Sequence, residues 1–116
     1  LAEDYWLLFT WGTARVYEWN EDGQVVGNCH KLPEKSFTRR LLDPEEITVC
    51  YGNLLEKLHT QNPSLQVLFT VSPIRHARDG MHGNQLSKAV LLLAADRLCR
   101  RLPYCHYFPA YEILDG

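Results

Sequence analysis

Three short apolar segments of the chain are typical of strands in a buried sheet. They cover residues 5–11, 65–72 and 104–108, and each is followed by a glycine or a proline. In the first segment the apolar residues follow one another almost without interruption, which is the pattern of a strand covered on both faces. We therefore expect three parallel strands, the first of them buried on both sides.

Two longer segments between these strands repeat their apolar residues with the period of a helix. The first has strong start signals, because Asp43 can cap it, Pro44 suits the first helical position and Glu46 completes a capping box. Asn62-Pro63 ends it, and the second segment covers about residues 85–102. The expected buried faces are Ile47, Tyr51, Leu54, Leu55 and Leu58 in the first helix, and Leu86, Val90, Leu91, Ala94, Ala95 and Leu98 in the second.

The order of these elements predicts an α/β fold. Strands that alternate with helices favour right-handed crossovers and a parallel sheet with helices on both faces. Residues 15–42 interrupt the alternation as an irregular excursion, with a turn at Asp22-Gly23 and brief strand pairing around Val25-Val26. Sheets of this class usually have about five or six strands. We therefore expect residues 1–116 to form one incomplete domain, whose sheet is completed by a partner chain or by strands outside this sequence.

Composition and charge exclude several classes of partner. The formal net charge is −2, and the basic residues form no stripe with interleaved aromatic residues, so we expect no nucleic-acid binding. The longest apolar run, residues 89–95, is too short to span a bilayer. Exposed edges of an incomplete sheet would favour self-association.

The cysteines and the start of the chain bear on its compartment. The four cysteines contain no CxxC pair, and no signal peptide precedes the first strand. We therefore expect reduced thiols and a cytoplasmic location, with a periplasmic location as the alternative. Because the chain begins at Leu1 and enters a strand almost at once, we also expect it to be part of a longer protein.

Candidate site residues follow from the sheet itself. Ligands of open parallel sheets bind beyond the carboxyl ends of the strands, which selects segments 12–14, 72–76 and 109–112. Ser87 and Lys88, near the start of the second helix, should face the same edge.

Each of these candidates has a second interpretation. Gly12 can bring a backbone N–H close to a substrate oxygen, or can simply permit the turn. The loop with Ser72, Arg75 and His76 suits an oxyanion or a phosphate, or is a solvated polar loop. His76 can act as a general base or can hold the loop in shape. The histidines and cysteines match no zinc-ligand spacing, so we expect no metal and no cofactor.

Five ordered blocks of sequence carry a resemblance to a known family. The blocks are TWGTA with VYE (residues 10–18), VGNCHKLP (26–33), TVSPIRH (70–76), SKAVL (87–91) and YFPAYEI (107–113). In this order they resemble the GSCFA family, which is grouped with the SGNH (GDSL-like) hydrolases. The resemblance implies a flavodoxin-like, three-layer α/β/α sandwich and esterase or acyl-transfer chemistry on a small-molecule or glycan ester.

The resemblance also assigns roles to individual residues. In that superfamily a serine attacks the ester, a histidine in an Asp-x-x-His segment activates it, and a glycine and an asparagine hold the oxyanion. Gly12 and Thr13 match the start of the Gly-x-Asn-Asp block, whereas Ala14 stands at the asparagine position, where Asn28 can substitute if the excursion folds back. Ser72, Arg75 and His76 should line the pocket.

The serine signature is absent from this sequence, and so is the Asp-x-x-His segment near the C-terminus, so we expect a central fragment that is inactive alone. Two other functions stay open. One is a non-catalytic module that binds an anionic or carbohydrate ligand through Arg75, His76 and Lys88, and the other is a structural fragment that depends on a partner.

Overall fold

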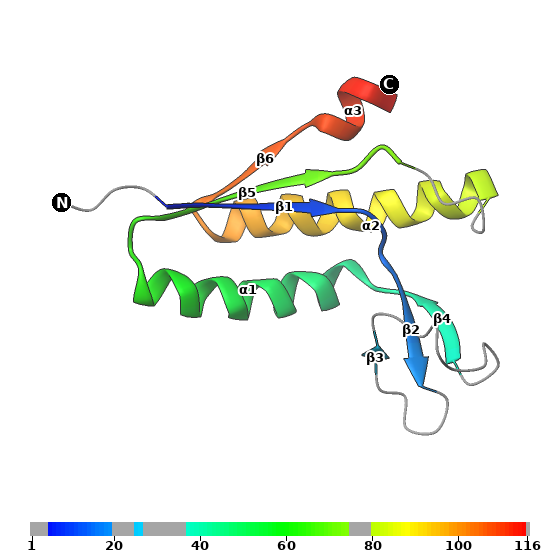
Figure 1. The fold of residues 1–116 in the computed structure, drawn as a ribbon, viewed down its shortest axis with the longest axis horizontal. Helices are drawn as coiled ribbons and strands as arrows, with labels where there is room; N and C mark the ends of the chain where they lie inside the picture. The colour runs from blue at the N-terminus through cyan, green and yellow to red at the C-terminus, as the bar shows by residue number, and fades with distance from the viewer. Residues whose placement is uncertain (1–4, 20–24, 27–36, 75–79, 116) are drawn as a thin grey trace.

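The computed structural model of the chain describes residues 5–19, 25–26, 37–74 and 80–115. Within these residues the main sheet has three strands in the order β1-β5-β6, which are β1 (Tyr5–Trp11), β5 (Leu65–Val71) and β6 (Cys105–Phe108) (Figure 1). A second described sheet has the order β3-β2-β4 and consists of β3 (Val25–Val26), β2 (Arg15–Trp19) and β4 (Phe37–Leu41). The described helices are α1 (Pro44–Gln61), α2 (Gly80–Arg101) and α3 (Ala110–Asp115).

The strands of the main sheet are parallel, as the sequence predicts. Leu7 pairs with Val67, and Val67 in turn pairs with Cys105. The carboxyl ends of the strands therefore meet at one edge of the sheet. The second sheet, which is antiparallel, and the start of α2 lie at this same end (Figure 1). The prediction of an α/β fold with a flavodoxin-like parallel sheet is confirmed, and Val25-Val26 does pair with β2.

The start of α1 follows the predicted capping box. The Asp43 side chain accepts a hydrogen bond from the Glu45 N–H at 2.8 Å, and Glu46 Oε1 accepts one from the Asp43 N–H at 2.9 Å. These two contacts satisfy N–H groups that have no partner inside the helix. The helix ends at Asn62, whose N–H donates to the Leu58 carbonyl at 2.9 Å.

The start of α2 differs from the prediction, because the helix begins at Gly80 and not near residue 85. Its first turns contain two glycines, a histidine and an asparagine, which are residues of moderate or low helix propensity. Contacts offset this low propensity. Asn84 Nδ2 donates to the Gly80 carbonyl at 2.6 Å, and Arg15 Nη2 donates to the Gly83 carbonyl at 3.1 Å. Because Arg15 comes from β2, a local pattern does not reveal the second contact.

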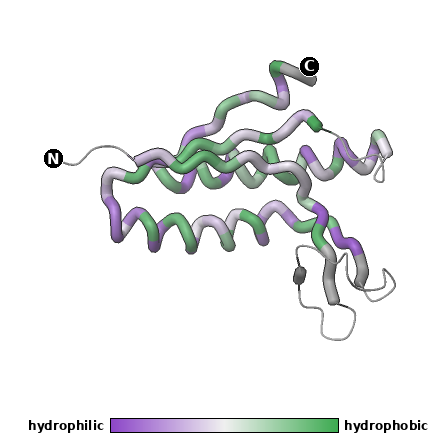
Figure 2. The backbone as a smooth tube through the Cα atoms, in the orientation of Figure 1, coloured by the Kyte–Doolittle hydropathy of each residue, from purple (hydrophilic) through white to green (hydrophobic). Residues whose placement is uncertain are grey.

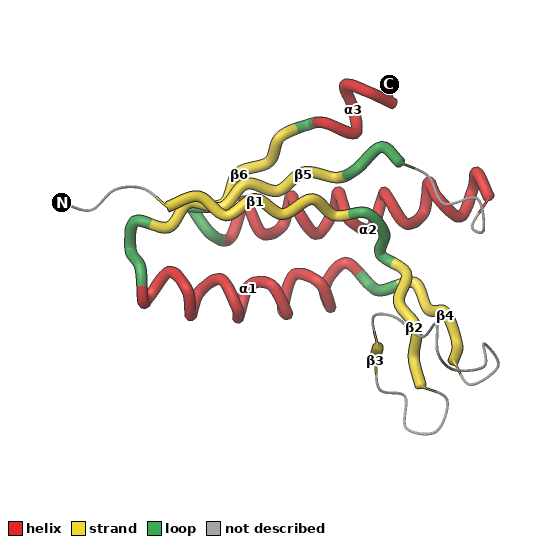
Figure 3. The backbone as a smooth tube through the Cα atoms, viewed as in Figure 1, coloured by secondary structure: helices red, strands yellow, loops and turns green. Residues whose placement is uncertain are grey.

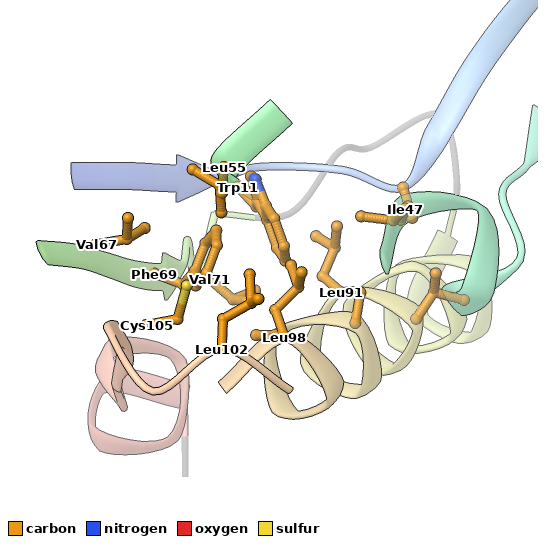
Figure 4. Close-up of a cluster of buried hydrophobic side chains, with 14 of the residues drawn as sticks. Trp11, Ile47, Leu55, Val67, Phe69, Val71, Leu91, Leu98, Leu102 and Cys105 are labelled. Carbon is orange, nitrogen blue, oxygen red and sulfur yellow. The ribbon is translucent and has the colours of Figure 1, made fainter. Parts of the chain in front are cut away.

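Helices α1 and α2 cover one face of the main sheet and enclose the core (Figure 4). Trp11 and Phe69 pack with their ring centroids 4.7 Å apart, and Tyr51 of α1 meets Trp11 edge-on at 5.0 Å. The predicted apolar faces are buried or half-buried except for Leu54 and Leu86, which are exposed. In α2, Ser87 and Lys88 are buried near Leu86, so the buried face there is polar.

The opposite face of the sheet carries several exposed apolar side chains within the described residues. Side chains alternate along each strand, so Trp6, Leu8 and Phe108 point away from α1 and α2. They are 58%, 64% and 51% exposed. The prediction that residues 5–11 are buried on both faces is therefore wrong for the described part of the chain. Figure 2 shows how the apolar stretches of β1 and β5 contrast with the hydrophilic end of β4. The described residues form an incomplete sandwich, in which α1 and α2 are one helical layer.

Candidate functional site

The loop Gly12–Ala14 leaves β1 at the carboxyl edge of the sheet, beside the segment that follows β5. Figure 3 shows both strands running into loops at this edge. The two segments are joined by a hydrogen bond from the Ser72 N–H to the Trp11 carbonyl at 2.8 Å. The structure thus brings Gly12 and Ser72 to one edge, as the strand-end rule predicts.

Two successive peptide groups of this loop are fixed through their carbonyl oxygens. The Trp11 carbonyl accepts from Ser72, and the Gly12 carbonyl accepts from Lys88 Nζ at 2.5 Å. In a trans peptide the N–H points opposite to the C=O, and the described chain contains no cis bond. The Gly12 N–H therefore points away from β5, and the Thr13 N–H points away from Lys88. Within the described residues, neither N–H donates a hydrogen bond.

Ser87 anchors the rest of the loop. Its Oγ accepts from the Ala14 N–H at 2.8 Å and lies 3.1 Å from Thr13 Oγ1. The Ala14 carbonyl accepts from the Leu42 N–H at 2.9 Å, which ties the loop to the segment before α1. Ser87 and Lys88 are each only 2% exposed. Buried polar groups are tolerated when they are hydrogen-bonded. These contacts therefore explain how two polar side chains can lie on the buried face of α2.

Gly12 itself stands beside open space. A Cβ built at Gly12 would meet no described heavy atom within 4 Å. Its φ is not in the positive range, since Gly80 is the described glycine with that conformation. Neither packing against described residues nor backbone conformation therefore requires glycine here. A close approach by another group would require it.

Ser72 contributes its backbone N–H to this edge, and its side chain is hydrogen-bonded to a neighbouring residue of the same loop. Ser72 Oγ accepts a hydrogen bond from the Ile74 N–H at 3.1 Å. This contact holds the turn after β5 and involves no described base. The predicted site residues Asn28, Arg75 and His76 lie outside the described residues, so their roles stay predictions.

The third predicted segment, residues 109–112, is held by two tyrosines. Tyr111 Oη donates to Gln85 Oε1 of α2 at 2.6 Å, and Tyr107 Oη donates to Glu112 Oε1 at 2.5 Å. Burial, and then the bond to Glu112, raise the pKa of Tyr107, because both disfavour the phenolate. These contacts fix α3 against the sheet edge and engage the Glu112 carboxylate.

Sequence reasoning missed two residues at this edge that bury polar side-chain atoms. Asn84 is buried in the first turns of α2, where the pattern predicts a loop. Trp11 is buried at the end of β1, and its Nε1 has no hydrogen-bond partner among the described residues. A tryptophan directly before a strand-ending glycine is the signal that could have drawn attention to the second.

The described part of the chain offers neither a cluster of metal-ligating side chains nor a helix that could span a membrane. No group of three or more His, Cys, Asp or Glu side chains there could hold a metal ion. No described helix has the length and apolar character needed to cross a membrane. Cys50, Cys99 and Cys105 are free thiols, and burial raises the pKa of Cys105 to about 12, which keeps its thiol protonated.

Comparison with known protein families identifies the family of this chain. The sequence pattern described as the GSCFA family matches residues 1–116. The chain belongs to the GSCFA family. No curated protein and no solved structure matches it. The family resemblance seen in the five sequence blocks is thereby confirmed for this GSCFA chain, while its grouping with the SGNH hydrolases stays a prediction.

Proposed function

We propose that this GSCFA chain supplies the oxyanion-binding edge of a serine esterase or acyltransferase of the SGNH type. The observation that carries the proposal is the Gly12 N–H. It lies at the carboxyl end of a parallel strand, is directed away from β5 by the Ser72–Trp11 bond, and has no partner within the described residues. A fixed donor without a partner is what an oxyanion hole requires.

The proposed reaction assigns one task to this donor. A serine Oγ attacks the carbonyl carbon of the ester while a histidine takes the serine proton. The carbonyl π electrons move to the oxygen, and the Gly12 N–H stabilises the resulting negative charge. When the intermediate collapses, the bond to the alkoxy oxygen breaks and the alcohol leaves with the proton from histidine. Water, or a second alcohol in a transferase, then attacks the acyl-serine in the same way and frees the serine.

The proposal requires the full-length protein to supply the serine and the histidine. The serine signature is absent from residues 1–116, and the Asp-x-x-His spacing occurs there only at Asp79 and His82, in the middle of the chain and not near its C-terminus. The Gly12 N–H points toward the edge of β1 that has no neighbour among the described strands, since β5 occupies the other edge. A serine-bearing segment placed beside β1 would therefore meet this donor. The proposed substrate class is a small-molecule or glycan ester.

A simple binding module is less well supported by the geometry. That alternative relies on Arg75, His76 and Lys88 as ligand contacts. Lys88 is 2% exposed and donates to the Gly12 carbonyl, so it is not available to a ligand at the surface. Its role as a direct anion contact is not favoured, while Arg75 and His76 lie outside the described residues.

Hydrolysis of p-nitrophenyl acetate by the full-length protein tests the proposed function. We expect steady release of nitrophenol that stops when a fluorophosphonate modifies the serine or when that serine is replaced. Residues 1–116 alone should show no serine-dependent turnover. Tight binding of an anionic or glycan ligand without turnover of any ester would instead support the binding module.

A further inference from the structure

Lys88 is a buried cation that holds one particular peptide group. Its Nζ donates to the Gly12 carbonyl, and the residue is 2% exposed. The partner atom belongs to the loop at the carboxyl end of β1, 76 residues away in sequence. Burying an ammonium group is costly unless it is hydrogen-bonded. A methionine or leucine would fill the same space without that cost, so the position suits a role for the charge itself.

The bond to Lys88 determines what the next N–H can do. Because the peptide between Gly12 and Thr13 is trans, fixing its carbonyl toward α2 directs the Thr13 N–H away from that helix. A hydrogen bond from a cation to the carbonyl also polarises the amide, which strengthens its N–H as a donor. Thr13 is exposed, and its N–H donates no hydrogen bond within the described residues.

The neighbouring contacts hold Thr13 in this orientation. Thr13 Oγ1 shares a hydrogen bond with Ser87 Oγ at 3.1 Å and accepts one from the Arg15 N–H at 3.1 Å. The side chain is therefore turned to Ser87, and the backbone N–H of Thr13 has no partner among the described residues.

Ala14, the next residue in the loop, cannot supply a second donor. Ala14 is fully buried, and its N–H is taken by Ser87. It therefore has neither a side-chain nor a backbone donor to offer.

We infer that Lys88 is a positioning residue, which fixes and polarises the Gly12–Thr13 peptide so that the Thr13 N–H acts as a second oxyanion donor beside the Gly12 N–H. The inference rests on the proposed esterase or acyltransferase function. Ser87 completes the anchor by holding the Thr13 side chain and the Ala14 N–H. In this account Lys88 does not touch the substrate, and its effect reaches the reacting oxygen through one peptide group.

Replacement of the charge in the full-length protein tests the inference by kinetics. Lys88→Met keeps the length and the apolar stem but removes the charged donor. We expect kcat for p-nitrophenyl acetate to fall about 10–100-fold, with KM changed less than about threefold, because an oxyanion contact acts in the transition state. Lys57→Met is the matched control, since Lys57 is exposed on α1, and its kcat should stay at the wild-type value. A purely structural lysine would lower thermal stability and leave the kcat of the folded protein unchanged, which would overturn the inference.

A spectroscopic measurement keeps the test valid if Lys88→Met does not fold. A phenylboronic acid forms a tetrahedral adduct with a reactive serine and mimics the oxyanion. In the wild-type full-length protein, its addition should move the Thr13 amide proton downfield, and an unmoved Thr13 resonance beside a formed adduct would contradict the inference. If the wild-type protein neither hydrolyses the ester nor forms the adduct, the proposed function itself has failed. If it does both and only the Lys88 and Thr13 effects are absent, the inference alone has failed.

Discussion

The two parts of α2 bury side chains of opposite character. Near the carboxyl edge of the sheet the helix buries Asn84, Ser87 and Lys88, whereas further along it buries apolar residues. The buried apolar residues of this second part are Val90, Leu91, Ala94, Ala95 and Leu98. One helix therefore packs on the core through one part and holds the Gly12–Ala14 loop through the other.

Stability and function depend on different parts of α2. Apolar burial stabilises the fold through the hydrophobic effect. Burial of Ser87 and Lys88 needs hydrogen bonds merely to offset desolvation, and those bonds go to the loop between β1 and β2. The buried polar residues of α2 therefore serve to orient this loop, and they contribute little to stability. The following variants of the full-length protein are expected to separate the two effects.

The largest effect on stability is expected in the apolar part. Leu98 is fully buried between the sheet and α1 (Figure 4). Leu98→Ala should lower the free energy of unfolding by about 2–5 kcal/mol, because it removes apolar contacts and leaves a cavity. Urea unfolding measures this change, and kcat of the folded fraction should not change. A loss below about 1 kcal/mol would mean that Leu98 is not in a close-packed core.

The largest effect on activity is expected at Gly12. A Cβ there meets no described atom within 4 Å, so Gly12→Ala should leave the melting temperature unchanged. The added methyl group would occupy the space that the ester oxygen must approach, and kcat/KM should fall about 100-fold. Gly52→Ala is the matched control, because its Cβ would make only an ordinary contact with Leu98 Cδ2 at 3.8 Å. The Gly52 variant should keep full activity and gain up to about 1 kcal/mol of helix stability.

Ser87→Ala should affect both properties to a smaller degree. The variant leaves the Ala14 N–H without its acceptor, which costs about 1–3 kcal/mol for a buried group. It also releases Thr13 Oγ1, so kcat should fall as the loop loosens. Chemical denaturation and ester hydrolysis measured on the same sample give both quantities. If the free energy of unfolding and kcat both keep their wild-type values, Ser87 does not anchor the loop.

The smallest effect is expected at the start of α1, where Glu46 pairs with Arg40 of β4 at 2.7 Å. The bonds from Arg40 and the Asp43 N–H lower the pKa of Glu46 from 4.5 to about 2. A carboxyl with a lowered pKa stabilises the fold above its unfolded pKa and loses that effect as the pH falls through its folded pKa.

The Glu46→Gln variant measures this contribution. Because both side chains are partly exposed, the wild type should exceed the variant by less than about 1 kcal/mol at pH 7. The difference should shrink between pH 4.5 and pH 2, as unfolding experiments across that range can show. A constant difference over the whole range would contradict the assignment.

Features set by local chemistry were predictable from the sequence. The capping box at Asp43 depends on residues within one turn, and it forms as expected. The parallel sheet follows from the alternation of strands and helices, and its geometry brings Gly12 and Ser72 to one edge. Ser87 and Lys88 could be assigned to this edge because α2 begins beside it.

Features set by distant contacts could not be predicted in the same way. The first turns of α2 depend in part on Arg15 from another sheet, so their sequence alone resembles a loop. Leu86 fits the apolar period but is exposed, because Ser87 and Lys88 turn to a loop more than 70 residues away. The exposed face of β1 was also missed, since a run of apolar residues does not show what covers each side.

The affinity of a tetrahedral mimic shows whether the end of β1 receives the oxyanion. Binding of a phenylboronic acid and of the matching carboxylic acid is measured by calorimetry on full-length wild type and Gly12→Ala. If the end of β1 receives the oxyanion, the variant should lose at least about tenfold in boronate affinity and little in carboxylate affinity. Equal boronate affinities in the two proteins would contradict the account.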